Sequence, residues 1–164
     1  MELFRAGDGD GLEAIVLQRP QAVRHLIGRM WDTDQEVRRL AARALGVAAA
    51  ADPEKGADLA RRLLWALNDE SATNGLYGLA ALGEMGFSAP DLMAPFVGPM
   101  ASYLWDEGLR LEILKALARM AESDRGLIES VRGVLEDHAD TSDPEEMRLI
   151  EGLLNDTTGG PHES

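Results

Sequence analysis

Three segments of this chain carry the same short pattern at nearly regular intervals, and this repetition constrains the fold more than any other feature. The pattern is an apolar stripe ending in an Ala-Leu pair, with its leucine at Leu45, Leu82 and Leu117, which are 37 and then 35 residues apart. A period of this length corresponds to one supersecondary unit, which cannot bury its apolar stripe alone. The chain is therefore expected to fold as units that stack on one another.

Apolar residues recur every three or four positions along nearly the whole chain, which is the period of an amphipathic helix. Val23, Leu26, Ile27 and Met30 form one such stripe, and no stretch shows the alternation expected of a strand. Aromatic residues make up only 5% of a chain that is 45% hydrophobic, so Leu, Ala, Ile, Val and Met must build the core. This composition favours helices. We predict helices at 11–18, 21–31, 34–50, 53–67, 70–85, 90–104, 107–121, 124–138 and 144–155.

Several predicted helices begin with residues that are typical of helix N-termini. Thr33-Asp34-Gln35-Glu36 has the form of a capping box, in which a hydroxyl and a carboxylate bind free backbone N–H groups. Asp52-Pro53 and Asp143-Pro144 each place a capping carboxylate before a proline at the first helical position. These signals support the predicted starts of three helices.

Prolines and tryptophans within the repeats have mainly structural interpretations. Pro95 and Pro99 lack N–H donors inside the helix predicted at 90–104, so they should kink or split it before Tyr103. A tryptophan closes the helix before each repeated segment, which favours packing between units over a ligand groove. These tryptophans are Trp31, Trp65 and Trp105.

The best copy of the repeat resembles a HEAT or HEAT-like repeat of the armadillo class. It follows the pattern Asp-x-x-Val-Arg-x-x-Ala-x-x-Ala-Leu-Gly, with Asp34, Val37, Arg38, Ala41, Ala44, Leu45 and Gly46. Another copy matches part of the pattern, with Asp106, Leu109, Arg110, Ala116 and Leu117, whereas the copy between them has Gly75 in place of the arginine. The resemblance covers residues 20–155 and implies an all-α, right-handed α-α superhelix, a short solenoid of about four helix pairs. It also implies that Arg38 pairs with a turn aspartate such as Asp34 or Asp69. The alternative is a small anion site formed by Arg38, Arg39 and Arg43 with Arg61 and Arg62.

One domain, 1–155, is expected, followed by a disordered tail at 156–164. The first residues lack the order of a signal peptide, and no run of about 18 apolar residues predicts a membrane span. We therefore expect a cytoplasmic protein.

The charge of the chain favours a basic protein partner over nucleic acid. The net charge is −13, yet residues 1–65 carry ten Lys/Arg and ten Asp/Glu, while residues 66–164 carry six and nineteen. The acidic C-terminal half would repel phosphate backbones and attract a basic surface. The alternative is that this charge only keeps the protein soluble.

No motif predicts catalysis, a cofactor or a metal. The chain has no cysteine, and it shows no phosphate loop, zinc motif or Ser-His-Asp spacing. The segment 8–11 does not continue as a calcium loop, since Leu12 and Arg19 occupy ligand positions. His138 lies among aspartates, a pattern that fits either weak ion binding or an acidic loop.

The middle of the chain suggests a surface for a partner. It contains more apolar side chains than two packed helices need, with few charges, which points to a surface covered by another chain. The alternative is that the middle repeat is simply more deeply buried. Its candidate contacts are Met85, Phe87, Met93, Phe96, Met100 and Tyr103.

The resemblance also implies a concave side lined by the second helix of each pair. The residues expected there are Arg39, Arg43, Tyr77, Glu112 and Lys115. The sequence thus predicts a non-catalytic adaptor that binds another protein. The alternatives are an enzyme accessory subunit, such as the HEAT-like proteins that attach bilins, and a scaffold that forms its own homodimer.

Overall fold

The computed structural model describes residues 9–68 and 73–155, and within these ranges all regular structure is helical. The predicted disordered tail, 156–164, lies outside the described residues. The helices are α2 (Gly9–Gln18), α3 (Ala22–Arg29), α4 (Gln35–Ala51), α5 (Pro53–Trp65), α6 (Thr73–Ser88), α7 (Pro90–Ala101), α8 (Glu107–Ser123), α9 (Gly126–Glu129), α10 (Arg132–Asp137) and α11 (Pro144–Asn155). Short 3₁₀ segments, η1 (Ala66–Asn68) and η2 (Ser102–Trp105), extend α5 and α7.

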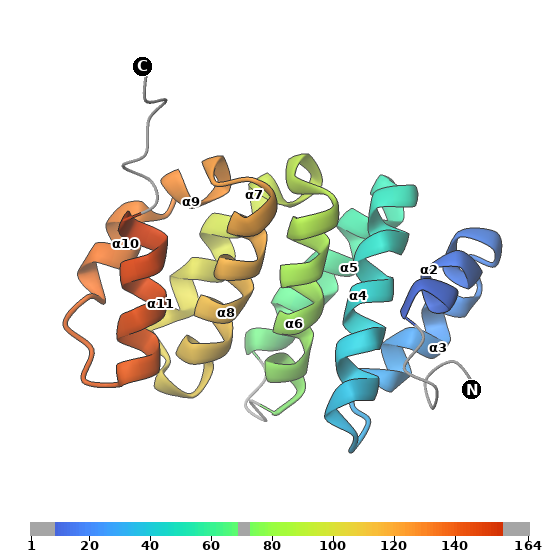
Figure 1. Ribbon diagram of the computed structural model, residues 1–164, viewed down its shortest axis with the longest axis horizontal. Coiled ribbons are helices and arrows are strands. Elements are labelled where there is room, and N and C mark those ends of the chain that lie inside the picture. The colour runs from blue at the N-terminus through green and yellow to red at the C-terminus, as the bar shows by residue number, and fades with distance from the viewer. Residues whose placement is uncertain (1–8, 69–72, 156–164) are drawn as a thin grey trace.

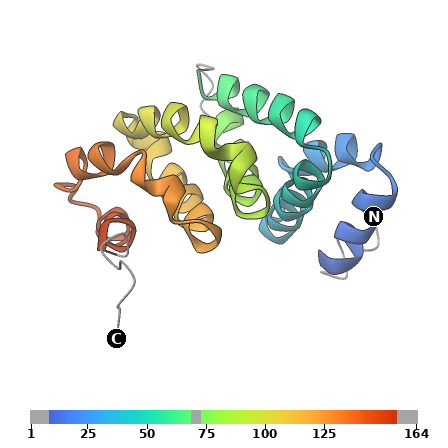
Figure 2. The same cartoon turned by 90° about the horizontal axis from the view of Figure 1, so that it is seen from above.

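The helices form two layers that follow a common arc (Figures 1 and 2). In the inner layer α2, α4, α6, α8 and α11 lie side by side, and each packs against the next one along the chain. The outer layer contains α3, α5 and α7, followed by α9 and α10. The inner layer lines the concave side of the arc, so residues on its exposed face share one surface.

The start of α4 corrects one detail of the predicted capping box. Asp34, not Thr33, occupies the N-cap position, and its Oδ1 accepts a hydrogen bond of 2.8 Å from the Glu36 backbone N–H. The other predicted caps are confirmed. Asp52 and Asp143 each accept a backbone hydrogen bond in the first turn of α5 and α11, respectively.

Arginines at equivalent positions of α4 and α8 hold the turn before each helix. The Arg38 Nη1 donates to the carbonyl oxygens of Asp32, at 2.5 Å, and Thr33, at 3.2 Å. The Arg110 Nε donates to the carbonyl oxygen of Leu104 at 2.6 Å. The repeated arginine therefore has a structural role, but it binds turn carbonyls rather than the aspartate carboxylates that the resemblance implied.

The helix predicted at 124–138 is wrong as a single element, because it divides into α9 and α10. Between them the Ser130 hydroxyl donates to the Leu127 carbonyl oxygen at 2.9 Å. A serine side chain that binds a nearby carbonyl competes with the helical backbone bonds, and the following Val131 leaves helical geometry with φ −118° and ψ 9°.

The prolines of α7 do not interrupt it. Helical geometry continues through Pro95 and Pro99 to Ala101 and then changes to 3₁₀ at Ser102, just before Tyr103. The missing N–H groups of Pro95 and Pro99 would have bonded the carbonyls of Asp91 and Pro95, and both of those residues are exposed. The Ser102 hydroxyl donates to the Pro99 carbonyl oxygen at 2.6 Å, which supports this transition.

The methionines of the middle segment belong to the core, and their predicted role as partner contacts is wrong. The side chains of Met85, Met93 and Met100 are completely buried. Helices α6 and α7 have neighbours on both sides within their layers and also pack against each other. Their surplus of apolar residues therefore serves several interfaces within the chain.

The predicted packing role of the tryptophans is wrong as well. Trp31, Trp65 and Trp105 are 41%, 76% and 68% exposed. The buried residues at the ends of the outer helices are the neighbouring Met30, Leu67 and Leu104.

Candidate functional site

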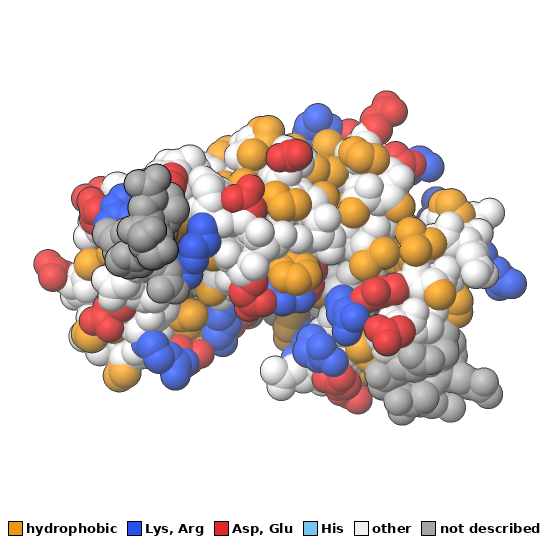
Figure 3. All heavy atoms as spheres, turned by 45° about the horizontal axis from the view of Figure 1, so that its top comes forward, with side chains coloured by type: hydrophobic (Ala, Val, Ile, Leu, Met, Phe, Trp, Pro, Cys, Tyr) orange, Lys and Arg blue, Asp and Glu red, His pale blue; other side chains and the backbone are white. Residues whose placement is uncertain are grey.

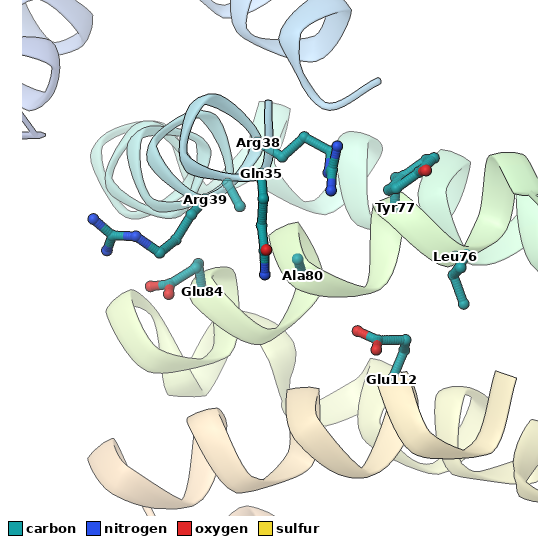
Figure 4. A pocket seen from close by; sticks show the side chains of 9 residues that line it. Gln35, Arg38, Arg39, Leu76, Tyr77, Ala80, Glu84 and Glu112 are labelled. Atoms are coloured by element: carbon teal, nitrogen blue, oxygen red, sulfur yellow. The ribbon is translucent and has the colours of Figure 1, made fainter. Parts of the chain in front are cut away.

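A groove on the concave side crosses three consecutive inner helices. It has a volume of about 300 Å³ and lies over the N-terminal halves of α4 and α8 and over α6 from Leu76 to Glu84 (Figure 4). Because each helix supplies side chains to it, the groove exists only when the units are stacked. Its lining residues are Gln35, Arg38, Arg39, Ala42, Leu76, Tyr77, Ala80, Glu84 and Glu112.

Two glycines allow the inner helices to pack closely at one end of the groove. A Cβ atom on Gly46 of α4 would be 2.6 Å from the carbonyl oxygen of Glu84 in α6. A Cβ atom on Gly83 of α6 would be 3.0 Å from the Cα of Ala116 in α8. The backbones of the inner helices thus approach one another closely at the Glu84 end of the groove.

Arg38 and Tyr77 form one wall of the groove. The Arg38 guanidinium carbon lies 5.0 Å from the centre of the Tyr77 ring, and the same guanidinium is held by the turn carbonyls before α4. An arginine over an aromatic face makes a favourable cation–π contact. Tyr77 is thereby positioned at the surface, and within the described residues its hydroxyl makes no hydrogen bond.

The opposite side of the groove carries an exposed ion pair. Arg39 donates to both carboxylate oxygens of Glu36, at 2.9 and 2.6 Å. This bidentate hydrogen bond lowers the pKa of Glu36 and raises the pKa of Arg39. Both side chains therefore stay charged over a wide pH range and remain accessible to a partner.

Glu84, at the C-terminal end of the groove, is tied to the next helix. Its two carboxylate oxygens accept hydrogen bonds from Arg119 Nε, at 3.1 Å, and Nη2, at 3.2 Å. The Arg119 guanidinium also lies 3.6 Å from the centre of the Phe87 ring. Partial burial opposes the charge of Arg119, yet its hydrogen bonds to Glu84 and Glu122 leave its pKa raised.

A second set of charges continues the surface from the groove towards α11. The Lys115 Nζ lies 3.2 Å from Glu112 Oε1 and 3.5 Å from Glu145 Oε1. Burial disfavours the charged lysine, but the two carboxylates outweigh this effect and raise its pKa. Glu112 points from α8 towards α6, so the acidic surface enters the groove (Figure 4).

The structure brings only part of the predicted contact set together. Arg39, Tyr77 and Glu112 line the groove, and Lys115 lies beside it. The other predicted contacts lie elsewhere, because their neighbours hold them. Arg43 pairs with Asp10 and Glu13 of α2, Phe96 lies under Arg61 in the outer layer, and the Tyr103 hydroxyl donates to Asn68 Oδ1.

Sequence reasoning missed six lining residues, Gln35, Arg38, Ala42, Leu76, Ala80 and Glu84, although it gave Arg38 a structural role. Their positions follow the helical spacing of residues already predicted. Leu76, Ala80 and Glu84 lie at successive turns of the helix that presents Tyr77, and Gln35 precedes Arg38 by one turn. Helical periodicity was therefore the signal that could have found them.

No group of three or more His, Asp or Glu side chains suited to a metal ion occurs in residues 9–68 and 73–155. The ring of His138 instead donates from Nδ1 to the Val134 carbonyl oxygen at 2.9 Å. Within the same ranges, no helix combines the length and hydrophobicity needed to cross a bilayer.

Comparison with known proteins concerns the fold alone. No protein-family model and no curated protein matches the sequence. A similar arrangement occurs in the crystal structure of an engineered protein, a target of the Northeast Structural Genomics Consortium, with a TM-score of 0.60 and 22% sequence identity. The similarity covers 90% of this chain and 66% of that one, so this chain spans slightly less than two thirds of its length.

Proposed function

We propose that the chain is a HEAT-like helical-repeat module, coiled as a right-handed α-α superhelix, that binds another protein in its concave groove. The observation that carries this proposal is the groove itself. It combines a tyrosine whose ring contacts an arginine with charged side chains from three stacked helices. Tyrosine and arginine are enriched among the residues that contribute most to protein–protein affinity.

The partner segment is proposed to be basic. Glu84 is paired with Arg119, whereas Glu112 and Glu145 share the single Lys115, so one negative charge remains uncompensated between the groove and α11. The excess of nineteen Asp/Glu over six Lys/Arg in residues 66–164 adds a long-range field of the same sign. Complementary fields raise association rates and reject partners of the wrong charge.

Site-specific photocrosslinking in a cell extract would test the location of binding even when the partner is unidentified. A benzophenone amino acid would replace Ala80, which is exposed on the groove floor, and in a control it would replace Ala94, exposed on outer helix α7. We expect a partner to crosslink to the residue at position 80 and not to the residue at position 94. Equal crosslinking from both positions would exclude the concave groove as the binding surface.

The identified partner then tests the charge argument. Glu112→Lys should weaken binding about tenfold or more, since a like charge would face the basic segment. Wild-type affinity should also fall as salt is added. An affinity that neither change alters would contradict a basic partner. A crosslinked dimer of the chain itself would indicate a self-associating scaffold instead of an adaptor.

A further inference from the structure

A second groove lies at the opposite end of the helices, between the first two helix pairs. It has a volume of about 570 Å³, nearly twice that of the concave groove, and it borders the loops that leave α2 and α4. Hydrophobic side chains gather over the N-terminal helices on this face, with basic side chains beside them (Figure 3). The lining includes Val16, Leu17, Pro20, Val23, Ile27, Ala48, Ala51 and Leu59.

The apolar character of this groove results from a mismatch between its two walls. On the α2–α3 side Leu17 is 57% exposed, and Val23 and Ile27 are only partly buried. On the α4–α5 side the lining includes the small residues Ala48, Ala49 and Gly56, and a Cβ atom on Gly56 would already be 2.9 Å from the Ala49 Cβ. The large side chains of one wall therefore face a shallow floor that cannot cover them.

The net charge of the side chains around the groove is positive. Asp52 pairs with Lys55 at 3.1 Å, and Asp58 pairs with Arg61 at 2.5 Å, so both acidic residues of the lining are neutralised. The two arginines of the lining, Arg24 and Arg62, are exposed, and in the described part of the chain their side chains make neither an ion pair nor a hydrogen bond.

Arginine side chains without an ion pair or hydrogen bond are concentrated near this groove. Among the lysines and arginines of residues 9–68 and 73–155, only the side chains of Arg19 and Arg148 are also without such partners. Arg19 is adjacent in sequence to Pro20, which lines the groove. In a chain with a net charge of −13, this is a local positive surface around an apolar groove.

We propose that this groove binds an acidic amphipathic helix of a partner protein. Large apolar side chains at i, i+3 or i+4, and i+7 would contact Leu17, Val23 and Ile27, which is the usual arrangement when a helix lies in a groove. Asp or Glu residues flanking this stripe would pair with Arg24 and Arg62. The groove volume is within the range of pockets that enclose most of an apolar ligand.

The charge requirement separates this surface from the concave groove. A basic segment suits the carboxylates of the concave groove, whereas an acidic segment suits Arg24 and Arg62. The second proposal does not depend on the first, because the two grooves share no lining residue.

Peptide display provides the test. A random 16-residue library displayed on phage would be selected against the folded wild-type protein, and the enriched peptides would be synthesised with a fluorescent label. The expected consensus has two or three large apolar residues at helical spacing with Asp or Glu beside them. Binding of these peptides should weaken about tenfold or more in the double variant Arg24→Glu, Arg62→Glu, which reverses both free charges.

Matched variants give the controls. Arg148→Glu makes the same kind of charge reversal at an unpaired arginine of α11, and it should leave binding unchanged. Leu17→Asp should abolish binding by placing a charge among the apolar contacts. All of these positions are exposed, so circular dichroism should show folded proteins.

Four outcomes would overturn the proposal. One is a consensus that is neutral or basic, and another is binding that the Arg24→Glu, Arg62→Glu variant leaves unchanged. The third is a selection without enrichment together with binding to vesicles of phosphatidylcholine and phosphatidylserine that the same variant abolishes. That result would assign the groove to an anionic lipid surface. A loss of peptide binding in Glu112→Lys would instead place the peptide in the concave groove.

Discussion

At the scale of single residues, burial decides which of several similar side chains can act at the surface. The tryptophans are exposed and the middle methionines are buried, although the sequence pattern suggested the reverse for both groups. Glycines differ in the same way. Gly46 is buried against the backbone of α6, while no atom of a neighbouring element lies within 4 Å of a Cβ added to Gly152.

The variant Gly46→Ala should destabilise the protein. Its Cβ would be 2.6 Å from the Glu84 carbonyl oxygen, so α4 and α6 would have to move apart. We expect a loss of about 1–3 kcal/mol in the free energy of unfolding, despite the better helix propensity of alanine. In contrast, Gly152→Ala should gain about 0.5–1 kcal/mol. Urea unfolding measures both, and equal effects would contradict the close contact.

Tryptophan fluorescence should report solvent-exposed indoles in the folded protein. Since Trp65 and Trp105 are 76% and 68% exposed, acrylamide should quench most of the native emission without unfolding the chain. Trp65→Phe should lower the stability very little because it removes few packed atoms. Emission that resists quenching until the protein unfolds would show that these side chains are buried after all.

At the scale of elements, side chains that bind the turns determine where the inner helices begin. Asp34 and Asp106 cap α4 and α8, and Arg38 and Arg110 bind the carbonyls of the preceding turns. Since the turns connect the two layers, these contacts also set how each outer helix leads into its inner partner.

Replacing Arg110 by lysine should not be conservative. The guanidinium donates from two nitrogens to the Leu104 and Trp105 carbonyls, and a lysine ammonium cannot reproduce this geometry. We expect a loss of about 1–2 kcal/mol, typical of hydrogen bonds made by a charged group. Thermal unfolding checks the effect, and Arg148→Lys, at an exposed site, is the control. A stability unchanged by Arg110→Lys would contradict the structural role.

Asp52 makes the stability of α5 depend on pH. Hydrogen bonds from the Lys55 side chain and backbone lower the pKa of Asp52 below its ordinary value of 3.8. Because the pKa of Asp52 is lower in the folded than in the unfolded protein, the ionised carboxylate stabilises the folded state above pH 3.8. This stabilisation is lost as the pH falls through the folded-state pKa. Asp52→Asn should therefore lower stability at pH 7 and reduce the loss on acidification. Unfolding curves from about pH 7 to about pH 2.5 would show this, and parallel curves for both proteins would count against it.

At the scale of the whole molecule, one continuous core joins all the units. Buried residues form a single cluster that extends from Leu12 in α2 to Leu153 in α11. The acidic and basic surfaces are likewise properties of the assembled layers, because side chains from two or more helices form each groove.

Met85→Ala tests the continuity of this core. The side chain is completely buried in α6, at the centre of the inner layer. We expect a loss of about 2–5 kcal/mol, as for other buried large-to-small substitutions. The calorimetric and van't Hoff enthalpies of unfolding should still agree, because the core is shared. Separate transitions would show that the units unfold independently.

The sequence predicted most of the helices and part of the site. Apolar spacing located nine helical segments, and the acidic residues before proline marked two of their starts correctly. It did not predict the division at Ser130, because a side-chain hydrogen bond to Leu127 competes there with an otherwise helical pattern. Arg39, Tyr77 and Glu112 were expected on one side of the molecule, and they line the same groove because they lie at the same or adjacent positions of the stacked repeats.

Local physical chemistry is thus sufficient to predict the helical class, the length of the repeated unit, the helix caps and the excess of acidic residues in the C-terminal half. Each depends only on residues that are near in sequence or on the total charge. Tertiary structure alone decides that Met85 is buried and Trp65 exposed, since both satisfy the same apolar pattern. It also decides that Arg24 and Arg62 lie unpaired beside one apolar groove. Those properties depend on the neighbouring helices, whose contacts no single segment encodes.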